Sequence, residues 1–258
     1  MSGWNAEQYL KFKRERTQPS YDLAAGITVR DPARIIDIGC GPGNSTAVLA
    51  ERFKGAYILG ADNSQDMIAS AKKSHPELDF MLFDAEKDFE KISQRFDVVF
   101  SNACIQWVPA HDRLIKNMFG LLAPGGMLAI QVPINYDEPI HKIIAEVSHS
   151  AKWQGKFSVY REFYTLTPGE YFDLLSELTD DFRMWETIYY HRMGSHQDIM
   201  EWYKGTGLRP YLEALVDDDR REFENDVYRE IVKAYPVQKS GEIIFRFPRL
   251  FFTASKGD

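Results

Sequence analysis

The stretch Ile35-Ile36-Asp37-Ile38-Gly39-Cys40-Gly41-Pro42-Gly43-Asn44 decides the fold of this chain. Its apolar start is typical of a buried strand, its three alternate glycines are typical of a tight turn, and residues 45–50 have the composition of a helix. Glycine is needed where the backbone adopts a positive φ or approaches a ligand more closely than a Cβ atom allows. We therefore expect Gly39, Gly41 and Gly43 to form a bare backbone ledge on which a flat or extended ligand lies.

The residues around this turn separate two classes of cofactor. The dinucleotide pattern G-x-G-x-x-G requires its third glycine at the position of Asn44, so the match fails there. Asp37, just before the turn, would also repel a pyrophosphate, whereas its carboxylate suits a cofactor that carries an ammonium and a sulfonium group. The pattern D-x-G-x-G-x-G therefore favours S-adenosylmethionine over a nicotinamide dinucleotide.

From residue 34 to residue 133 the chain alternates apolar runs of strand length with segments of helical periodicity. This order predicts a parallel sheet with helices on both faces, which is a doubly wound, Rossmann-like α/β fold. Five strands are expected at residues 35–38, 57–62, 78–83, 96–101 and 127–133, with a helix exit and turn at 121–126 and two late strands at 184–190 and 250–255. A helix is expected between the two late strands, at residues 217–235.

The carboxyl ends of the second and third expected strands carry acidic residues. In open α/β sheets ligands bind beyond these ends, so Asp62 is placed to accept both hydroxyls of an adenosine ribose and Asp84 to accept from the adenine amino group. Met67 is available to pack on the adenine ring, and Asn63 and Ala85 adjoin the two carboxylates. Each carboxylate also has a structural alternative, a favourable charge at a helix N-terminus for Asp62 and turn formation for Asp84.

The fourth expected strand leads into a loop that should border the transferred methyl group. Asn102 and Ala103 offer backbone and a small surface to the cofactor, while Gln106 and Trp107 are placed to line the acceptor side. A core position for Trp107 is an equal alternative, because tryptophan is highly buried on average. His111 has no charge partner nearby in the sequence, and we expect it to be solvated rather than catalytic.

The N-terminal residues 4–21 have the spacing of an amphipathic helix, which Pro19 is expected to end. This helix either caps the sheet or folds over the cofactor as a lid that excludes water from the transfer. In the second interpretation Tyr9 contacts the substrate and Arg16 contacts the cofactor.

Composition excludes several classes of function. The 258 residues carry a formal net charge of −7, which argues against a nucleic-acid partner. No segment has the apolar length of a membrane span and no signal peptide is recognisable, so we expect a cytoplasmic protein whose oligomeric state is open, with a monomer favoured. Cys40 and Cys104 lie in apolar motifs, which argues for reduced thiols and against a disulfide or a metal site. An anionic substrate would need its own local cluster of arginines.

The motifs between residues 30 and 133 resemble, in type and in order, those of the class I S-adenosylmethionine-dependent methyltransferases. The resemblance implies a single domain over residues 1–258, with a lid helix at 1–29, a cofactor-binding core at 30–133 and substrate-cap insertions at 134–180 and 191–241. It also implies a sheet of seven mostly parallel strands, whose last strand is antiparallel and lies beside the fifth.

Longer segments are similar to a narrower family within this superfamily, which methylates small tricarboxylic acids such as trans-aconitate. They are residues 4–12, 15–17, 102–109, 201–212 and 246–251. The resemblance implies methyl transfer to one carboxylate of trans-aconitate, which gives a monomethyl ester. Transfer to another small acid or to a malonyl-carrier thioester is one alternative, and a protein that binds S-adenosylmethionine without transfer is another.

A tricarboxylate needs guanidinium groups, which bind carboxylates with two parallel hydrogen bonds. The late segments offer Trp202 and the arginines Arg209, Arg246 and Arg249 as candidate substrate ligands, with Arg16 and Lys204 as alternatives. Because Arg246 and Arg249 differ in strand parity, at most one of them is expected to bind the substrate. A carboxylate with a pKa of about 4 is already ionised at neutral pH, so we expect no general base, no other catalytic residue and no metal.

Overall fold

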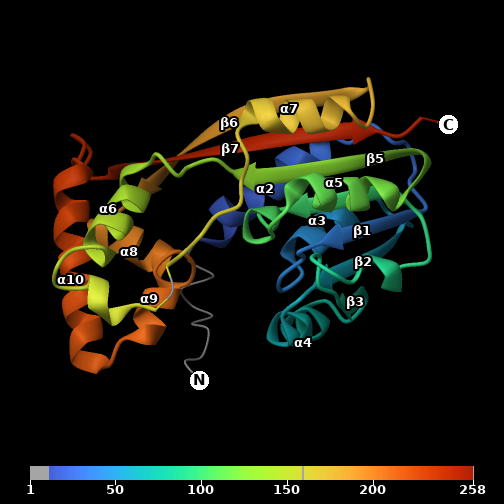
Figure 1. The fold of residues 1–258 in the computed structure, drawn as a ribbon. Helices are drawn as coiled ribbons and strands as arrows, with labels where there is room; N and C mark the ends of the chain where they lie inside the picture. The colour runs from blue at the N-terminus through green and yellow to red at the C-terminus, as the bar shows by residue number, and fades with distance from the viewer. Residues whose placement is uncertain (1–11, 159, 258) are drawn as a thin grey trace. The chain divides into compact units, whose positions relative to one another are not determined.

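The computed structural model describes residues 12–158 and 160–257, and Figure 1 shows their fold. A seven-stranded sheet has the strand order β3-β2-β1-β4-β5-β7-β6. Its strands are β1 (Arg34–Ile38), β2 (Tyr57–Asp62), β3 (Asp79–Leu82), β4 (Phe96–Asn102), β5 (Leu122–Pro133), β6 (Phe182–Met193) and β7 (Ile243–Ser255). The predicted doubly wound α/β fold is confirmed.

The direction of the strands positions the ligand edge of the sheet. The neighbours β3-β2-β1-β4-β5 pair in parallel, so their carboxyl ends meet at one edge. The strand order reverses between β1 and β4, which is the switch point where open α/β sheets bind ligands. Strand β7 runs antiparallel to β5, as Figure 1 shows, so the expectation of an antiparallel last strand beside the fifth is confirmed.

The central strands are apolar on both faces. In β1 the side chains of Ile35 and Ile36 are fully buried, and in β4 the same holds for Val98, Val99 and Phe100. Such continuous apolar runs, without alternation, are typical of parallel strands that helices cover on both faces. A polar side chain buried in this environment therefore needs a reason for being there.

Some helices connect the strands of the sheet, and others belong to a separate helical unit that is described below. They are α2 (Lys13–Ala25), α3 (Asn44–Arg52), α4 (Gln65–Ser74), α5 (His111–Gly120), α6 (Pro139–Ser148), α7 (Pro168–Ser176), α8 (His196–Lys204), α9 (Arg209–Ala214) and α10 (Asp217–Ala234). Short 3₁₀ helices lie at η1 (Phe89–Lys91), η2 (Ile105–Trp107) and η3 (Gln154–Lys156). The expected late helix at 217–235 corresponds to α10.

The described residues group into two compact units. The sheet unit comprises residues 16–133, 163–187 and 249–257, and the helical unit comprises residues 12–15, 134–158, 160–162 and 188–248. Residues 163–187, which include α7, group with the sheet, although most of them fall inside the segment that the sequence assigns to a substrate cap. The helical unit is thus made from several separate stretches of the chain.

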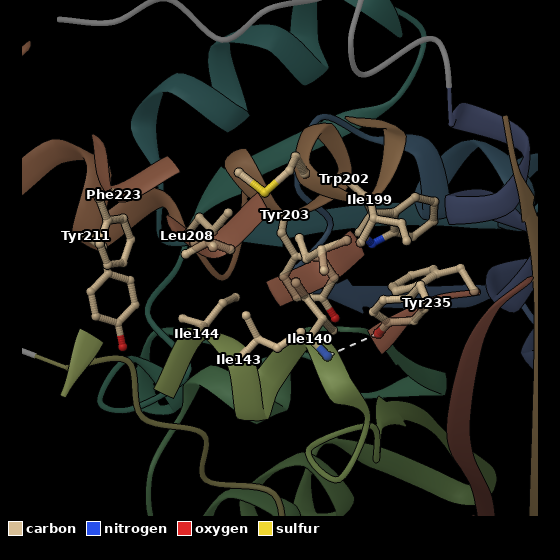
Figure 2. Close-up of a cluster of buried hydrophobic side chains, with 14 of the residues drawn as sticks. Ile140, Ile143, Ile144, Ile199, Trp202, Tyr203, Leu208, Tyr211, Phe223 and Tyr235 are labelled. Carbon is tan, nitrogen blue, oxygen red and sulfur yellow. Dashed lines mark hydrogen bonds between the residues drawn. The ribbon is translucent and has the colours of Figure 1, made fainter. Parts of the chain in front are cut away.

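The helical unit has its own aromatic core (Figure 2). Trp202 and Tyr203 are 4% and 3% exposed, and the ring of Tyr211 stacks on that of Phe223 with centroids 5.8 Å apart. The hydroxyl of Tyr235 accepts the backbone N–H of Ile140 at 3.1 Å. This contact satisfies a backbone donor in the first turn of α6, where a helix has no internal acceptor for it.

The expectation that Pro19 ends the N-terminal helix is wrong, because α2 continues to Ala25. Proline removes one backbone donor and crowds the preceding turn, which costs about 3 kcal/mol in a helix interior. The turn after Pro19 compensates by burial, since Leu23 and Ala24 are 0% and 1% exposed. Residues 4–11, and with them Tyr9, lie outside the described residues.

Strands β5, β6 and β7 differ most from their expected bounds. Strand β5 starts at Leu122, which pairs with Phe96 before a register shift, so the expected turn at 121–126 is mostly strand. Strands β6 and β7 are longer than expected, and β7 begins at Ile243. Pro248 fits within β7 because its carbonyl oxygen accepts the N–H of Ile134 at 3.1 Å, a bond that needs no donor from proline.

Candidate cofactor and substrate site

The glycine-rich turn after β1 has the backbone that the sequence predicts. Gly39, Gly41 and Gly43 have φ values of 80°, 54° and 91°, all in the left-handed region. A Cβ atom at Gly39 would overlap the side chain of Cys104, and one at Gly43 would lie 2.8 Å from the His75 ring. A Cβ atom at Gly41 would meet no described atom within 4 Å. Gly41 therefore faces open space, as a ledge for a ligand would.

Asp37 is the next-to-last residue of β1 and is fully buried. The hydroxyls of Ser45 and Thr46 donate to its Oδ2 atom at 2.6 and 2.8 Å, while Oδ1 has no hydrogen-bond partner among the described residues. Burial raises the pKa of Asp37 to about 6, although the two hydroxyls oppose this rise. A buried carboxylate with unused acceptor capacity is stabilised by a cation, so it fits the positive charges of S-adenosylmethionine.

Asp62, at the end of β2, ties this strand to the glycine turn. Its Oδ2 atom accepts the N–H of Gly41 at 2.9 Å, and its Oδ1 atom accepts the N–H of Ser64 at 2.9 Å. Each carboxylate oxygen has two acceptor positions, so one remains on each oxygen. The carboxylate is therefore held in place with the capacity that two ribose hydroxyls require.

The residues predicted to hold the adenine lie after β2 and β3. Met67 is partly buried in the first turn of α4, which Ser64 caps by accepting the Met67 N–H at 3.3 Å, and Asn63 is exposed. Asp84 accepts the N–H of Glu86 at 3.0 Å and pairs with Lys87 at 2.8 Å, and both contacts hold the pKa of its carboxyl below the usual value. Turn formation thus accounts for Asp84, and its contact with adenine stays a prediction, as does that of the half-buried Ala85.

Hydrogen bonds within the loop after β4, and from this loop to β5, fix its backbone. Asn102 ends the strand with its Oδ1 atom buried and without a hydrogen-bond partner among the described residues. Ala103 has a φ of 52°, which is uncommon for a residue other than glycine, and its N–H donates to the carbonyl of Gln131 at 3.0 Å. The side chain of Gln106 donates to the Ala103 carbonyl at 2.8 Å. Backbone strain of this kind is concentrated at functional sites.

Two aromatic residues follow in this loop region. The ring of Trp107 packs against that of Phe163 with centroids 5.0 Å apart, and the tryptophan is partly exposed. The expectation that His111 is solvated is wrong, since it is 3% exposed. Its Nε2 faces the carbonyl of Ile105 at 2.8 Å and its Nδ1 faces the Tyr171 hydroxyl at 2.7 Å. Burial lowers its pKa, which favours the uncharged imidazole, and the two hydrogen bonds fix the ring at the start of α5.

Comparison with known proteins connects this geometry to a family. A family model described as "Methyltransferase domain" matches residues 36–130. The trans-aconitate 2-methyltransferase of Rhodopseudomonas palustris (strain BisA53) is 41% identical over 258 residues, which cover 99% of this chain and 100% of that protein. The protein of the same name from Variovorax paradoxus (strain S110) is 40% identical, with 99% of each chain covered. This chain belongs to the trans-aconitate 2-methyltransferase family.

A solved structure supports the fold at a greater distance. The YcgJ protein from Bacillus subtilis matches with a TM-score of 0.59 at 12% sequence identity, covering 93% of this chain and 99% of that one. At this identity the likeness concerns the arrangement of strands and helices alone.

Three residues that the family resemblance offered as substrate ligands lie in the helical unit. Trp202 is buried in the aromatic core of that unit, where Figure 2 shows it beside Ile199 and Tyr203. Its ring centroid lies 5.1 Å from that of Phe12. Arg209 pairs with Glu213 at 2.7 Å on the surface of α9, and Arg246 pairs with Glu138. The Arg209–Glu213 pair is exposed, and such a pair contributes about 0–1 kcal/mol. Glu138, the partner of Arg246, is largely buried. The three substrate roles stay predictions.

The alternatives to these residues have different surroundings. Lys204 pairs with Glu224 at 2.8 Å, and Arg16 is half-buried on α2 in the sheet unit. Arg249 is only 4% exposed and donates to the side chain of Gln131 at 3.1 Å. The expectations from the sequence favour Arg246 over Arg249 and do not include Gln131. The signal that was available is a polar residue inside an apolar strand, since Gln131 interrupts the run of residues 127–133.

The two cysteines are buried thiols of low reactivity. Cys40 and Cys104 are free, and burial raises the pKa of the Cys40 thiol and raises that of Cys104 to about 12. Both are therefore uncharged at neutral pH and poor nucleophiles. Within residues 12–158 and 160–257, no group of three or more metal-ligating side chains could hold an ion, and no helix could span a membrane.

Proposed function

We propose that this protein is an enzyme that transfers the methyl group of S-adenosylmethionine to one carboxylate of trans-aconitate and so forms a monomethyl ester. The observation that carries the proposal is the end-to-end match, at 41% identity, to a relative of that name. The geometry of the sheet unit supports it, because a buried carboxylate, Asp37, and an open glycine ledge at Gly41 suit a cationic and extended cofactor.

In this proposal each part of the cofactor has its own residues. Asp37 and the glycine turn hold the methionine part, and Asp62 receives the ribose hydroxyls. The remaining proposed contacts are Asn63, Met67, Asp84 and Ala85 for the adenine side, and Arg16, Asn102 and Ala103 for the methionine side. The assignment of residues 1–29 as a lid and of 134–180 and 191–241 as substrate caps stays a prediction.

The bound cofactor would supply a methyl group on a sulfonium sulfur. An oxygen nucleophile in line with the C–S bond can take this methyl group, with S-adenosylhomocysteine as the leaving group. The carboxylate of the substrate is already ionised at neutral pH, so the protein needs no group to remove a proton. Burial lowers the pKa of His111, and it lowers that of His141 to about 4, so both imidazoles are weak bases. The chain therefore contributes alignment and the exclusion of water, with Gln106 and Trp107 lining the acceptor side.

Cofactor affinity is expected to depend on pH through Asp37. Only the ionised carboxylate attracts the cationic cofactor, and with a pKa raised to about 6 its ionised fraction falls as the pH drops below that value. The affinity for S-adenosylmethionine should thus fall by up to about tenfold per pH unit below pH 6. Titration calorimetry between pH 5 and pH 7.5 measures this dependence.

Two variants control the pH experiment. Asp37→Asn keeps an acceptor for Ser45 and Thr46 but has no charge, so its affinity should be weaker and nearly independent of pH. Asp84→Asn should keep the wild-type slope, because Lys87 holds the pKa of Asp84 below its usual value. A slope that persists in Asp37→Asn would show that another group is responsible.

The substrate assignment is tested by methyl transfer from labelled S-adenosylmethionine to a panel of acids: trans-aconitate, cis-aconitate, citrate, isocitrate and a malonyl thioester. We expect kcat/KM to be highest for trans-aconitate. A preference for another small acid or for the malonyl thioester would move the protein to that alternative. Cofactor binding without transfer to any member would leave a binding protein and refute the proposed reaction.

A further inference from the structure

Two polar side chains are buried together inside the sheet unit, next to the end of β4. Gln131 in β5 is 0% exposed and Arg249 in β7 is 4% exposed. The guanidinium of Arg249 donates from Nη1 to Oε1 of Gln131 at 3.1 Å. Both side chains interrupt an apolar environment, so their burial lowers stability unless their polar atoms are satisfied.

The orientation of the Gln131 amide follows from this contact. Arginine can only donate hydrogen bonds, so the atom facing Arg249 must be the amide oxygen. The amide nitrogen, Nε2, therefore points elsewhere, and it is buried without a hydrogen-bond partner among the residues that the structure describes. An unsatisfied buried donor is costly in free energy, and native proteins keep one chiefly where a ligand or water completes it.

The pair lies on the face of the sheet that carries the proposed cofactor residues. In the ladders, Asn102 is the partner of Gln131, Gln131 is the partner of Phe251, and Asp37 is the partner of Phe100. Partners share a face, and so do residues two apart along a strand. Asp37, Asn102, Gln131 and Arg249 therefore share one face, near the carboxyl ends of the parallel strands.

The chemistry of the pair defines its ligand. It offers amide N–H donors and a guanidinium, all of them donors, in a water-excluded place, which is the arrangement that binds a carboxylate. We propose that Gln131 and Arg249 form the receptor for one carboxylate of the acid substrate, an inference that rests on the proposed methyl transfer. Arg246, the candidate that the sequence favoured, lies three residues away on the opposite face of β7 and pairs with Glu138.

The receptor holds a carboxylate that does not react. Strong charged donors on the attacking oxygen would reduce its nucleophilicity, so they belong on another carboxylate of the same molecule. Loss of the receptor is therefore expected to raise KM for the acid more than it lowers kcat. Cofactor affinity should not change, because the receptor binds only the acid.

The decisive variant is Gln131→Glu. Glutamate has the same shape and still accepts from Arg249, so the fold is retained, but it replaces the free N–H donor with a negative oxygen. We expect KM for trans-aconitate to rise about 100-fold, because a like charge then faces the bound carboxylate. Calorimetry should show an unchanged affinity for S-adenosylhomocysteine. Gln238→Glu, at an exposed position, is the control for the change in net charge.

Each further outcome decides the inference. A wild-type KM in Gln131→Glu, or a parallel loss of S-adenosylhomocysteine affinity, would overturn it. If Gln131→Glu does not fold, Gln131→Met takes its place, because it removes the donor without adding charge. The same two quantities, KM for the acid and affinity for S-adenosylhomocysteine, then decide the inference. If the wild-type protein methylates no acid, the proposed function fails, and calorimetric binding of trans-aconitate to the protein loaded with S-adenosylhomocysteine decides the receptor instead. Binding that Gln131→Glu abolishes supports it, and unchanged or absent binding overturns it.

Discussion

The Gly41→Ala variant is expected to bind S-adenosylmethionine about 10- to 100-fold more weakly than the wild type while it folds normally. A methyl group at this position meets no described atom of the protein within 4 Å, so it does not disturb the turn by a clash. It occupies the ledge on which the cofactor is proposed to lie, and an overpacked contact of this kind costs about 1–3 kcal/mol. Titration calorimetry and a thermal melt measure the two effects separately.

Gly55→Ala is the matched control for the backbone. Gly55 also has a positive φ, 91°, and a Cβ atom there also meets nothing within 4 Å. Both variants therefore carry a similar conformational cost, and only Gly41→Ala should lose affinity. Normal cofactor binding by Gly41→Ala would show that the ledge is not the cofactor site.

The second large effect is expected for Asp62→Ala, which should weaken cofactor binding by about 100-fold or more. The substitution removes an acceptor for the N–H groups of Gly41 and Ser64 as well as the proposed ribose contact. Hydrogen bonds to a charged group contribute about 1.5–3 kcal/mol each. The dissociation constant of S-adenosylhomocysteine, measured without catalysis, tests this expectation.

Asp66→Ala controls for the loss of one negative charge near the same helix start, since Asp66 is exposed in the first turn of α4. It should leave the cofactor affinity close to the wild-type value. An Asp62→Ala protein that binds the cofactor normally but has a raised KM for the acid would contradict the assignment of Asp62 to the cofactor.

The sequence predicts the fold of the sheet unit and the backbone of its glycine turn well, because the signals for both are local. A strand, three alternate glycines and a helix start are adjacent in the chain, and the acidic residue that ends β2 is recognised from the strand alone. The positive φ values of Gly39, Gly41 and Gly43 follow directly from residue type. Topology also follows, since parallel strands joined by helices leave few arrangements.

The misassigned features depend on contacts between distant residues. His111 is buried with its Nδ1 atom hydrogen-bonded to the hydroxyl of Tyr171, 60 positions later, and no local pattern reports that contact. The α2 helix passes Pro19 because its last turn is buried, which outweighs a local helix breaker. Tertiary packing overrides local preference in both cases.

The substrate-binding residues are harder to predict from the sequence, for a related reason. An arginine in a sequence does not show whether a carboxylate of the protein already pairs with it, as Glu213 pairs with Arg209 and Glu138 with Arg246. The pairing of Gln131 with Arg249 joins residues that are 118 positions apart. Burial and an unsatisfied donor identify such a receptor, and both are properties of the folded chain.

Whether the protein forms a methyl ester of trans-aconitate is decided by the chemistry of the labelled product. The protein is incubated with trans-aconitate and S-adenosylmethionine labelled in its methyl group, and the acid product is then treated with mild alkali. We expect one label in the acid for each S-adenosylhomocysteine formed, and alkali should release that label as methanol and return trans-aconitate. A label that withstands alkali, or S-adenosylhomocysteine formed without a labelled acid, would show that no such ester is made.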